Sequence, residues 1–333
     1  MRVAVVGAGS WGTTVAGLTC HNADTLLWAR RKELADELNA DHTNSAYLPD
    51  IRLPEALRCS CDLEEAVSAA DVVVMAVPSH GFRDVLVEVA EHARPWVPVL
   101  SLTKGLEQGT QKRMTEVINE VLPDHPAGVL TGPNLAREVA VGHPAAAVVA
   151  MADRRIARAL RPLFAGPSFL VFTNLDIIGC EVAAVVKNVL AIAAGMVDGM
   201  GFGDNTKATL LTRGLTEMTR LGVALGGQPL TFSGLAGMGD LIATCSSSKS
   251  RNHTVGEELG KGRPLDEIVG EMKMVAEGVK SSKVVMALAA AHAVEMPIAE
   301  QVEAVCHRGV QVADALGSLM QRRAGSEFWG IST

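Results

Sequence analysis

The hydrophobic pattern of the chain changes character a little past its midpoint. Before that point, short apolar runs of strand length alternate with segments of helical periodicity. A run that is apolar at nearly every position is typical of a strand buried on both faces of a parallel sheet. The predicted strands are Arg2–Val6, Thr25–Ala29, Asp71–Val77, Val97–Leu102, Val129–Thr131, Ala145–Met151 and Phe169–Thr173.

Beyond residue 178 the pattern has the period of helices almost throughout, with many Ala and Leu residues. We therefore predict two domains. Residues 1–178 should form an α/β domain with a Rossmann-like doubly wound sheet, and residues 179–333 an all-α C-terminal domain. The predicted helices of the second domain include Thr206–Leu225, Leu265–Gly270, Ser281–Val294 and Ala299–Ala304, the last of them started by Pro297.

The stretch Glu181–Gly195 is apolar on every side of a helical wheel except at Lys187 and Asn188. A helix that is apolar all round belongs in a core. Burial removes water from an ammonium group and favours its neutral form, which is how proteins make lysines that act as acids and bases near neutral pH. Lys187 is therefore the candidate catalytic residue. The alternative is that Lys187 lies on a solvated edge of this helix.

Gly7, Gly9 and Gly12 form a G-x-G-x-x-G motif between the first predicted strand and an Ala/Val-rich helix. In this context the glycines allow a tight turn and let the backbone approach a pyrophosphate at the helix N-terminus. The motif predicts that the first domain binds a dinucleotide. A glycine-rich turn without a ligand is the alternative.

Two arginines, Arg30 and Arg31, follow the strand Thr25–Ala29. Enzymes that use NAD commonly carry an acidic residue here, which binds the ribose hydroxyls. A guanidinium group instead suits the 2′-phosphate of NADP. We therefore expect NADPH to bind at least as well as NADH, although the sequence does not exclude NAD. The alternative is that both arginines only begin the solvated helix Lys32–Asn39.

Polar residues follow two other predicted strands. Lys104 comes directly after Val97–Leu102, and Gly132 and Asn134 come after Val129–Thr131. In an open α/β sheet, ligands bind beyond the carboxyl ends of the strands. Lys104 is thus placed where it can touch a bound anion. An exposed loop lysine is the alternative.

A second polar constellation lies between residues 233 and 252. Three glycines precede Asp240, and glycines at such spacing let another segment approach closely. The simplest role for Asp240 is the N-cap of a following helix. Ser250, Arg251 and Asn252 then combine a hydroxyl, a guanidinium and an amide, which are good donors to a phosphate group. A flexible surface loop is the alternative for this last segment.

Composition narrows the possible partners. A net charge of −7 and an aromatic content of 4% argue against nucleic acid. The six cysteines form no CxxC pair, so we predict reduced thiols, no metal site and a cytoplasmic protein. The chain reaches Gly7 too soon for a secretory leader, and Lys187, Asn188 and Asp198 interrupt the longest apolar run, so no integral membrane segment is predicted. The sequence leaves the oligomeric state open, a homodimer included.

These motifs, in this order, resemble those of the bacterial-type NAD(P)-dependent glycerol-3-phosphate dehydrogenases over essentially the whole chain. The most specific of them lie at residues 186–189, 212–217, 234–241 and 250–252, and residues 7–12, 103–107 and 132–133 agree as well. The pair Asn134-Leu135 stands where the family more often has Ser or Thr followed by Phe, so that an amide contact replaces a hydroxyl contact there.

The resemblance implies a role for each matching residue. It makes Lys187 the general acid and base. Around the substrate it places Lys104, Gly132, Asn134, Lys187, Asp240, Ser250, Arg251 and Asn252. Around the coenzyme it places Gly7, Gly9, Ser10, Trp11, Gly12, Arg30, Arg31, Lys104, Ala136, Arg251, Val275 and Glu277.

The implied reaction is the reversible reduction of dihydroxyacetone phosphate to sn-glycerol 3-phosphate for glycerophospholipid biosynthesis. NADPH or NADH would deliver a hydride to the carbonyl carbon, and Lys187 would stabilise and protonate the alkoxide. Asp240 would orient Lys187 or the substrate, and Arg251 would hold the phosphate.

Two rival functions remain. One is a dehydrogenase of hydroxy acids or ketoacids that also uses a lysine of the helical domain. The donor-rich segment 246–252 argues against it, because a carboxylate needs fewer donors. The other is a redox sensor that binds the dinucleotide without catalysis, and such a protein has no need of Lys187 in an apolar helix.

Overall fold

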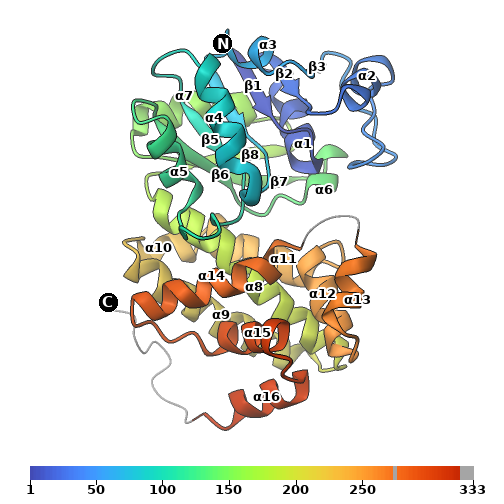
Figure 1. The fold of residues 1–333 in the computed structure, drawn as a ribbon, viewed down its shortest axis with the longest axis vertical. Coiled ribbons are helices and arrows are strands. Elements are labelled where there is room, and N and C mark those ends of the chain that lie inside the picture. Colours follow the sequence, from blue (N-terminus) through green and yellow to red (C-terminus); the bar gives the residue numbers. More distant parts are fainter. Residues whose placement is uncertain (273–275, 323–333) are drawn as a thin grey trace. The chain divides into compact units, whose positions relative to one another are not determined.

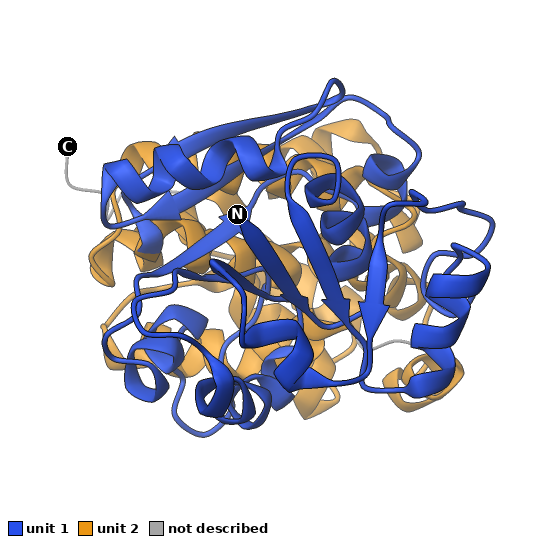
Figure 2. Cartoon of the chain, turned by 90° about the horizontal axis from the view of Figure 1, so that it is seen from above, with its two compact units in different colours: residues 1–177 blue, residues 178–333 orange. Residues whose placement is uncertain are grey.

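The computed structural model describes residues 1–272 and 276–322. The chain divides into two compact units, Met1–Ile177 and Ile178–Thr333, coloured separately in Figure 2. The first unit is an α/β domain and the second is helical (Figure 1). Val275, which was predicted to contact the coenzyme, lies outside the described residues.

The first unit is built on an eight-stranded sheet with the order β3-β2-β1-β4-β5-β6-β7-β8. Strands β1 to β6 are parallel, β7 is antiparallel to β6, and β8 is parallel to β7. The order of the first six strands is that of dinucleotide-binding doubly wound sheets, which confirms the predicted fold class. The strands are β1 (Arg2–Val6), β2 (Asp24–Trp28), β3 (Arg58–Ser60), β4 (Val72–Met75), β5 (Val99–Ser101), β6 (Ala127–Thr131), β7 (Ala145–Met151) and β8 (Phe169–Asn174).

Two features of the sheet differ from the sequence-based expectation. Strand β3 was not predicted, because its three residues, Arg-Cys-Ser, give no apolar run, and it pairs with β2 alone at one edge. The reversed direction of β7 was not predicted either. A continuous apolar run indicates burial on both faces but carries no information about strand direction.

Helices cover both faces of this sheet (Figure 2). Successive residues of β1 point to opposite faces, so Val3 and Val5 belong to one apolar core while Ala4 and Val6 belong to another. The helices of the unit are α1 (Ser10–Thr19), α2 (Lys32–Ala40), α3 (Leu63–Val67), α4 (Phe82–His92), α5 (Met114–Val121), α6 (Ala136–Ala140) and α7 (Arg154–Phe164).

The second unit is helical in its described residues. Its longest helix is α8, and every residue from Gly179 to Val197 is buried. By length and composition alone α8 could cross a membrane, but 89% of its most apolar window lies inside the protein, as in a core helix. The helices are α8 (Ile177–Gly199), α9 (Asp204–Ala224), α10 (Pro229–Phe232), α11 (Asp240–Ser246), α12 (Arg251–Gly260), α13 (Leu265–Glu271), α14 (Glu277–Ala291), α15 (Pro297–Arg308) and α16 (Val312–Met320).

The predicted helices of this unit are present with shifted ends. The helix predicted at Ser281–Val294 begins earlier, at Glu277, and ends at Ala291. Pro297 occupies the first turn of α15, as predicted, because proline lacks the N–H that would be unpaired there.

Candidate functional site

Lys187 is buried in the middle of α8, with only 4% of its surface exposed. Its Nζ donates to Oδ1 of Asp240 at 2.7 Å and to Oγ1 of Thr244 at 2.6 Å. Both partners are also buried. An ammonium group has three N–H donors, so these two contacts leave one for a ligand. The alternative in which Lys187 lies on a solvated edge is therefore wrong.

Asp240 does not act as an N-cap, contrary to the sequence-based expectation. Gly239 is the N-cap of α11, and the carboxylate of Asp240 turns toward Lys187 instead. The preceding turn, Leu235–Gly239, is a π-helix. A Cβ added at Gly237 would lie 2.1 Å from the carbonyl oxygen of Phe232, five residues earlier, so this glycine is required by the tightness of the turn itself and not by another segment of the chain.

Thr244 is a further residue of this site, which the sequence motifs did not indicate. It lies four residues after Asp240 on the same face of α11, and its hydroxyl is also 3.3 Å from the Asp240 carboxylate. The i, i+4 spacing on a helix that begins at a candidate site residue was the available signal.

A second polar contact begins at Asn188, the neighbour of Lys187. The Nδ2 of Asn252 donates to Oδ1 of Asn188 at 3.0 Å, and Oδ1 of Asn252 accepts the backbone N–H of Gly278 at 2.9 Å. In the sequence, Asn188 stands out only as a polar position in an apolar helix, with no role indicated. The contact joins α8, the first turn of α12 and the first turn of α14.

Residues 250–252 form the start of a helix, so the alternative of a flexible surface loop is wrong for them, although residues 248–249 just before them form an exposed turn. Ser250 is the N-cap of α12, and its hydroxyl accepts the N–H of His253 at 3.3 Å. Ser250 and Asn252 are buried, whereas Arg251 is exposed. Arg251 lies near Glu277. Although part of the Arg251 side chain reaches solvent, partial desolvation of the guanidinium lowers its pKa, and the Glu277 carboxylate opposes this change. A helix N-terminus flanked by an arginine favours an anion.

In the first unit, the turn between β1 and α1 is tightly packed at two of its three motif glycines. Gly7 has a φ of +118°, and a Cβ added there would lie 2.7 Å from the carbonyl oxygen of Ala76. Gly12 packs against the carbonyl oxygen of Gly7, which an added Cβ would approach to 1.9 Å. Gly9 is the N-cap of α1 and has no side chain that could cap the helix. A Cβ added there would meet nothing within 4 Å. The first-turn amides of α1 thus suit a dinucleotide phosphate.

Residues around this turn carry further groups that suit a nucleotide. Arg30 and Arg31 follow β2 and are exposed, and the guanidinium carbon of Arg31 lies 5.9 Å from the centre of the Tyr47 ring. The Ser10 hydroxyl donates to the carbonyl of Tyr47 at 2.8 Å. The indole Nε1 of Trp11 is buried and has no hydrogen-bond partner within residues 1–272 and 276–322.

Lys104, Gly132 and Asn134 meet at the ends of β5 and β6, as their places after two parallel strands suggested. The Nζ of Lys104 donates to the carbonyl of Gly132 at 3.0 Å and to Oδ1 of Asn134 at 2.6 Å. The Nδ2 of Asn134 is buried and lacks a partner in the described part of the chain, so it is a donor that a ligand could use. Ala136 begins α6 nearby, and its carbonyl accepts from Thr14.

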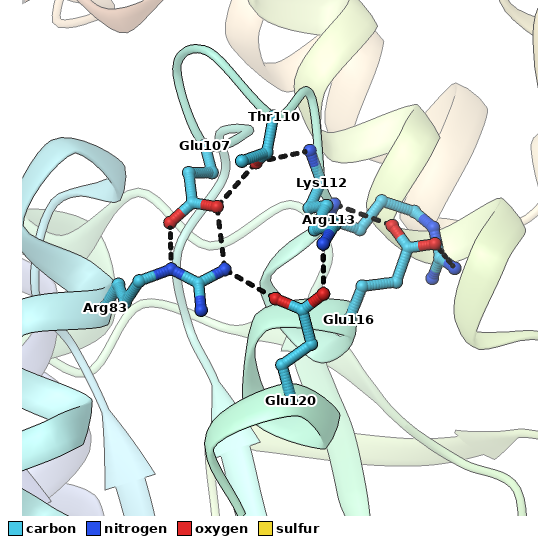
Figure 3. Close-up of polar contacts among 7 residues, drawn as sticks. All are labelled: Arg83, Glu107, Thr110, Lys112, Arg113, Glu116 and Glu120. Carbon is cyan, nitrogen blue, oxygen red and sulfur yellow. Dashed lines mark hydrogen bonds and ion pairs between the residues drawn. The ribbon is translucent and has the colours of Figure 1, made fainter.

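The loop that carries Lys104 is fixed at its far end by ion pairs (Figure 3). Arg83 of α4 donates to both carboxylate oxygens of Glu107, at 2.7 and 2.9 Å, and to Glu120 of α5 at 2.7 Å. Lys112 also pairs with Glu120. The hydrogen bonds from Arg83 lower the pKa of Glu107, which keeps that carboxylate ionised near neutral pH.

Glu217, the last residue of the motif at 212–217, has a structural role. Its buried carboxylate accepts the backbone N–H groups of Ile298 and Ala299, at 2.8 and 3.2 Å, in the first turn of α15. Burial raises its pKa to about 7, although these two N–H groups favour the ionised form. The contact ties α9 to α15.

Each unit thus gathers part of the predicted site. In the first unit lie Gly7, Gly9, Ser10, Trp11, Gly12, Arg30, Arg31, Lys104, Gly132, Asn134 and Ala136. In the second lie Lys187, Asp240, Ser250, Arg251, Asn252 and Glu277. The six cysteines are free thiols, and within the described ranges no group of three or more His, Cys, Asp or Glu side chains could hold a metal ion.

Comparisons with known proteins agree on one family. Residues 2–157 match the model of the N-terminal part of NAD-dependent glycerol-3-phosphate dehydrogenase, and residues 176–317 match that of its C-terminal part. The chain is 58% identical over 327 residues to glycerol-3-phosphate dehydrogenase (NAD(P)+) 2 of Sphingopyxis alaskensis, covering 98% of each chain. It is 53% identical to glycerol-3-phosphate dehydrogenase (NAD(P)+) 1 of Mycobacterium tuberculosis, covering 99% of this chain and 97% of that protein.

A solved structure is similar as well. The crystal structure of glycerol-3-phosphate dehydrogenase from Coxiella burnetii superposes with a TM-score of 0.91 at 37% identity, covering 96% of this chain and 99% of that one. These matches extend across both units, and they confirm both the predicted family and the use of NAD or NADP. The chain therefore belongs to the glycerol-3-phosphate dehydrogenases, which are NAD(P)-dependent oxidoreductases.

Proposed function

We propose that this enzyme reduces dihydroxyacetone phosphate to sn-glycerol 3-phosphate with NADPH or NADH, reversibly, in the cytoplasm and for glycerophospholipid synthesis. The observation that carries the proposal is the buried contact of Lys187 with Asp240 and Thr244. Lys187 lies on α8 next to Asn188. The side chain of Asn188 contacts the first turn of α12, and the N-terminus of that helix favours an anion.

The proton chemistry is assigned to Lys187. When hydride reaches the carbonyl carbon, the carbonyl oxygen becomes an alkoxide that needs both stabilisation and a proton. The free N–H of Lys187 supplies both, and in the reverse direction the neutral amine accepts the hydroxyl proton. Asp240 and Thr244 use the other two N–H groups and so fix the direction of the third.

The remaining groups hold the coenzyme and the substrate. The N-terminus of α1, with Gly7, Gly9 and Gly12, suits the pyrophosphate of NAD(P). The bound coenzyme supplies the hydride. Ser250, Arg251 and Asn252 suit the substrate phosphate, with the N–H groups of the first turn of α12. Lys104 and Asn134 offer further donors to the substrate.

The proposed reaction is tested by following the absorbance of NADPH with purified protein. Dihydroxyacetone phosphate should cause oxidation of NADPH and yield glycerol 3-phosphate, whereas dihydroxyacetone and a 2-ketoacid should react far more slowly. Faster oxidation with the ketoacid would support the rival dehydrogenase. Tight NADPH binding without oxidation by any of the three would support the redox sensor.

The choice of coenzyme is a separate prediction. Replacing Arg30 and Arg31 together with Ala should weaken NADPH binding by roughly 1.5–3 kcal/mol for each charged hydrogen bond lost, because a guanidinium pairs with the 2′-phosphate. NADH lacks this phosphate and should bind within a few-fold of its original affinity. The measurement is the dissociation constant of each coenzyme for both proteins. If NADPH and NADH change equally, these arginines are only the start of α2.

A further inference from the structure

Helices α8 and α12 touch through glycines. A Cβ added at Gly195 of α8 would lie 2.0 Å from the carbonyl oxygen of His253, and one added at Gly256 of α12 would lie 1.9 Å from the carbonyl oxygen of Ile192. Gly199 and Gly260 repeat the contact one turn further on, with added Cβ atoms 3.0 Å from each other's Cα. The two backbones therefore lie closer than any side chain would permit, which fixes the separation of the helices.

A close backbone contact sets a distance but not a rotation. The glycines themselves present no side chain that would fix the rotation, so the rotation depends on the side-chain contacts around them. The first turn of α12 carries Ser250, Arg251 and Asn252, so a small rotation of α12 would move the groups assigned to the substrate phosphate. Two polar contacts in the first turn of α12, beside the glycines, remove this freedom.

The first of these contacts is the bond between Asn188 and Asn252, on the side of the glycines toward Lys187. The second is made by Asp198, near the other end of α8. Its Oδ2 accepts from Nε2 of His253 at 2.7 Å and from Nζ of Lys207 of α9 at 2.6 Å. Asn252 and His253 are neighbours in sequence, so the first turn of α12 is held from both directions along α8.

The chemistry of the second contact suits a rigid anchor. His253 has only 4% of its surface exposed, so its ring has little freedom. Burial opposes ionisation of Asp198, but the hydrogen bonds from Lys207 and His253 outweigh it and lower the pKa of this carboxylate. Asp198 therefore stays charged near neutral pH, and hydrogen bonds to a charged acceptor are the stronger kind.

We propose that Asp198 is a positioning residue for the reaction: through His253 it sets the rotation of α12, and thereby the place of Arg251 and Asn252 relative to Lys187 and Asn188. The inference rests on the proposed role of Arg251 in holding the substrate phosphate. Asp198 itself touches neither substrate nor coenzyme in this scheme.

The test is a comparison of two substrates, dihydroxyacetone phosphate and dihydroxyacetone, with the full-length protein. Asp198→Ala should raise the KM for the phosphorylated substrate on the order of ten- to a hundredfold, the usual cost of losing a supporting contact behind a ligand-binding group. Its kcat should fall much less. The kcat/KM for dihydroxyacetone should stay within about twofold, because that substrate has no phosphate to misplace. Asp198→Asn keeps an acceptor of the same shape and should recover part of the loss.

Glu258→Gln is the matched control. Glu258 lies on the same helix, α12, and pairs with Lys261 and Arg263 rather than with α8. Its loss tests whether any ion pair of α12 affects the KM, and we expect no change for either substrate. Should Asp198→Ala fail to fold, His253→Phe removes the same hydrogen bond from the other side and should show the same pattern.

Arg251→Ala separates the two ways in which the inference could fail. It should weaken the phosphorylated substrate far more than the unphosphorylated one. If it weakens both equally, the phosphate is held elsewhere, and both the assigned role and the inference are wrong. If Arg251→Ala discriminates between the substrates but Asp198→Ala and His253→Phe do not, the site is assigned correctly and Asp198 is only a structural residue.

Discussion

Replacing Lys187 with Met is expected to lower the kcat for reduction of dihydroxyacetone phosphate by on the order of a hundredfold or more, the usual cost of a lost general acid. Met fills a similar volume in the core of α8 but offers no proton. The affinity for NADPH should change little, because the groups that suit the coenzyme pyrophosphate lie in the turn between β1 and α1.

The control for this variant is Lys261→Met, which removes a half-exposed lysine from the second unit. Its kcat should equal that of the original protein. The measurements are steady-state kinetics and the coenzyme dissociation constant for both variants. A kcat of Lys187→Met within a few-fold of the original value would show that the proton comes from another group.

The second large effect concerns stability. Asp240→Asn leaves the ammonium of Lys187 in the core without its counter-charge, and we expect the free energy of unfolding to fall by about 3–5 kcal/mol, as found when one partner of a buried ion pair is removed. The double variant Lys187→Met/Asp240→Asn has no buried charge at this place. It should recover most of the lost stability while remaining inactive.

Urea denaturation of the original protein, both single variants and the double variant gives these free energies. The four values form a double-mutant cycle, which gives the interaction free energy between the side chains of Lys187 and Asp240. A double variant as unstable as Asp240→Asn would show that the lost stability comes from packing of α11 and not from the unpaired charge.

The local sequence was sufficient to predict several parts of this protein. The apolar run Arg2–Val6 followed by Gly7, Gly9 and Gly12 predicted the first strand and its turn, and the structure has both. The apolar wheel of α8 predicted that Lys187 is buried. These predictions succeed because strand and helix periodicities report which positions face the core, and because glycine marks places where a backbone passes too close for a side chain.

The tertiary structure alone decided what lies opposite each buried group. Asp240 is 53 residues from Lys187 in sequence, and as the first residue of a helix it looked like an N-cap. Asn252 is 64 residues from Asn188, and His253 is 55 from Asp198. The direction of β7 and the presence of β3 were also fixed only by their neighbours. Periodicity specifies that a position is buried, but the partner of a buried polar group comes from another element, and only the packing of these elements brings the two together.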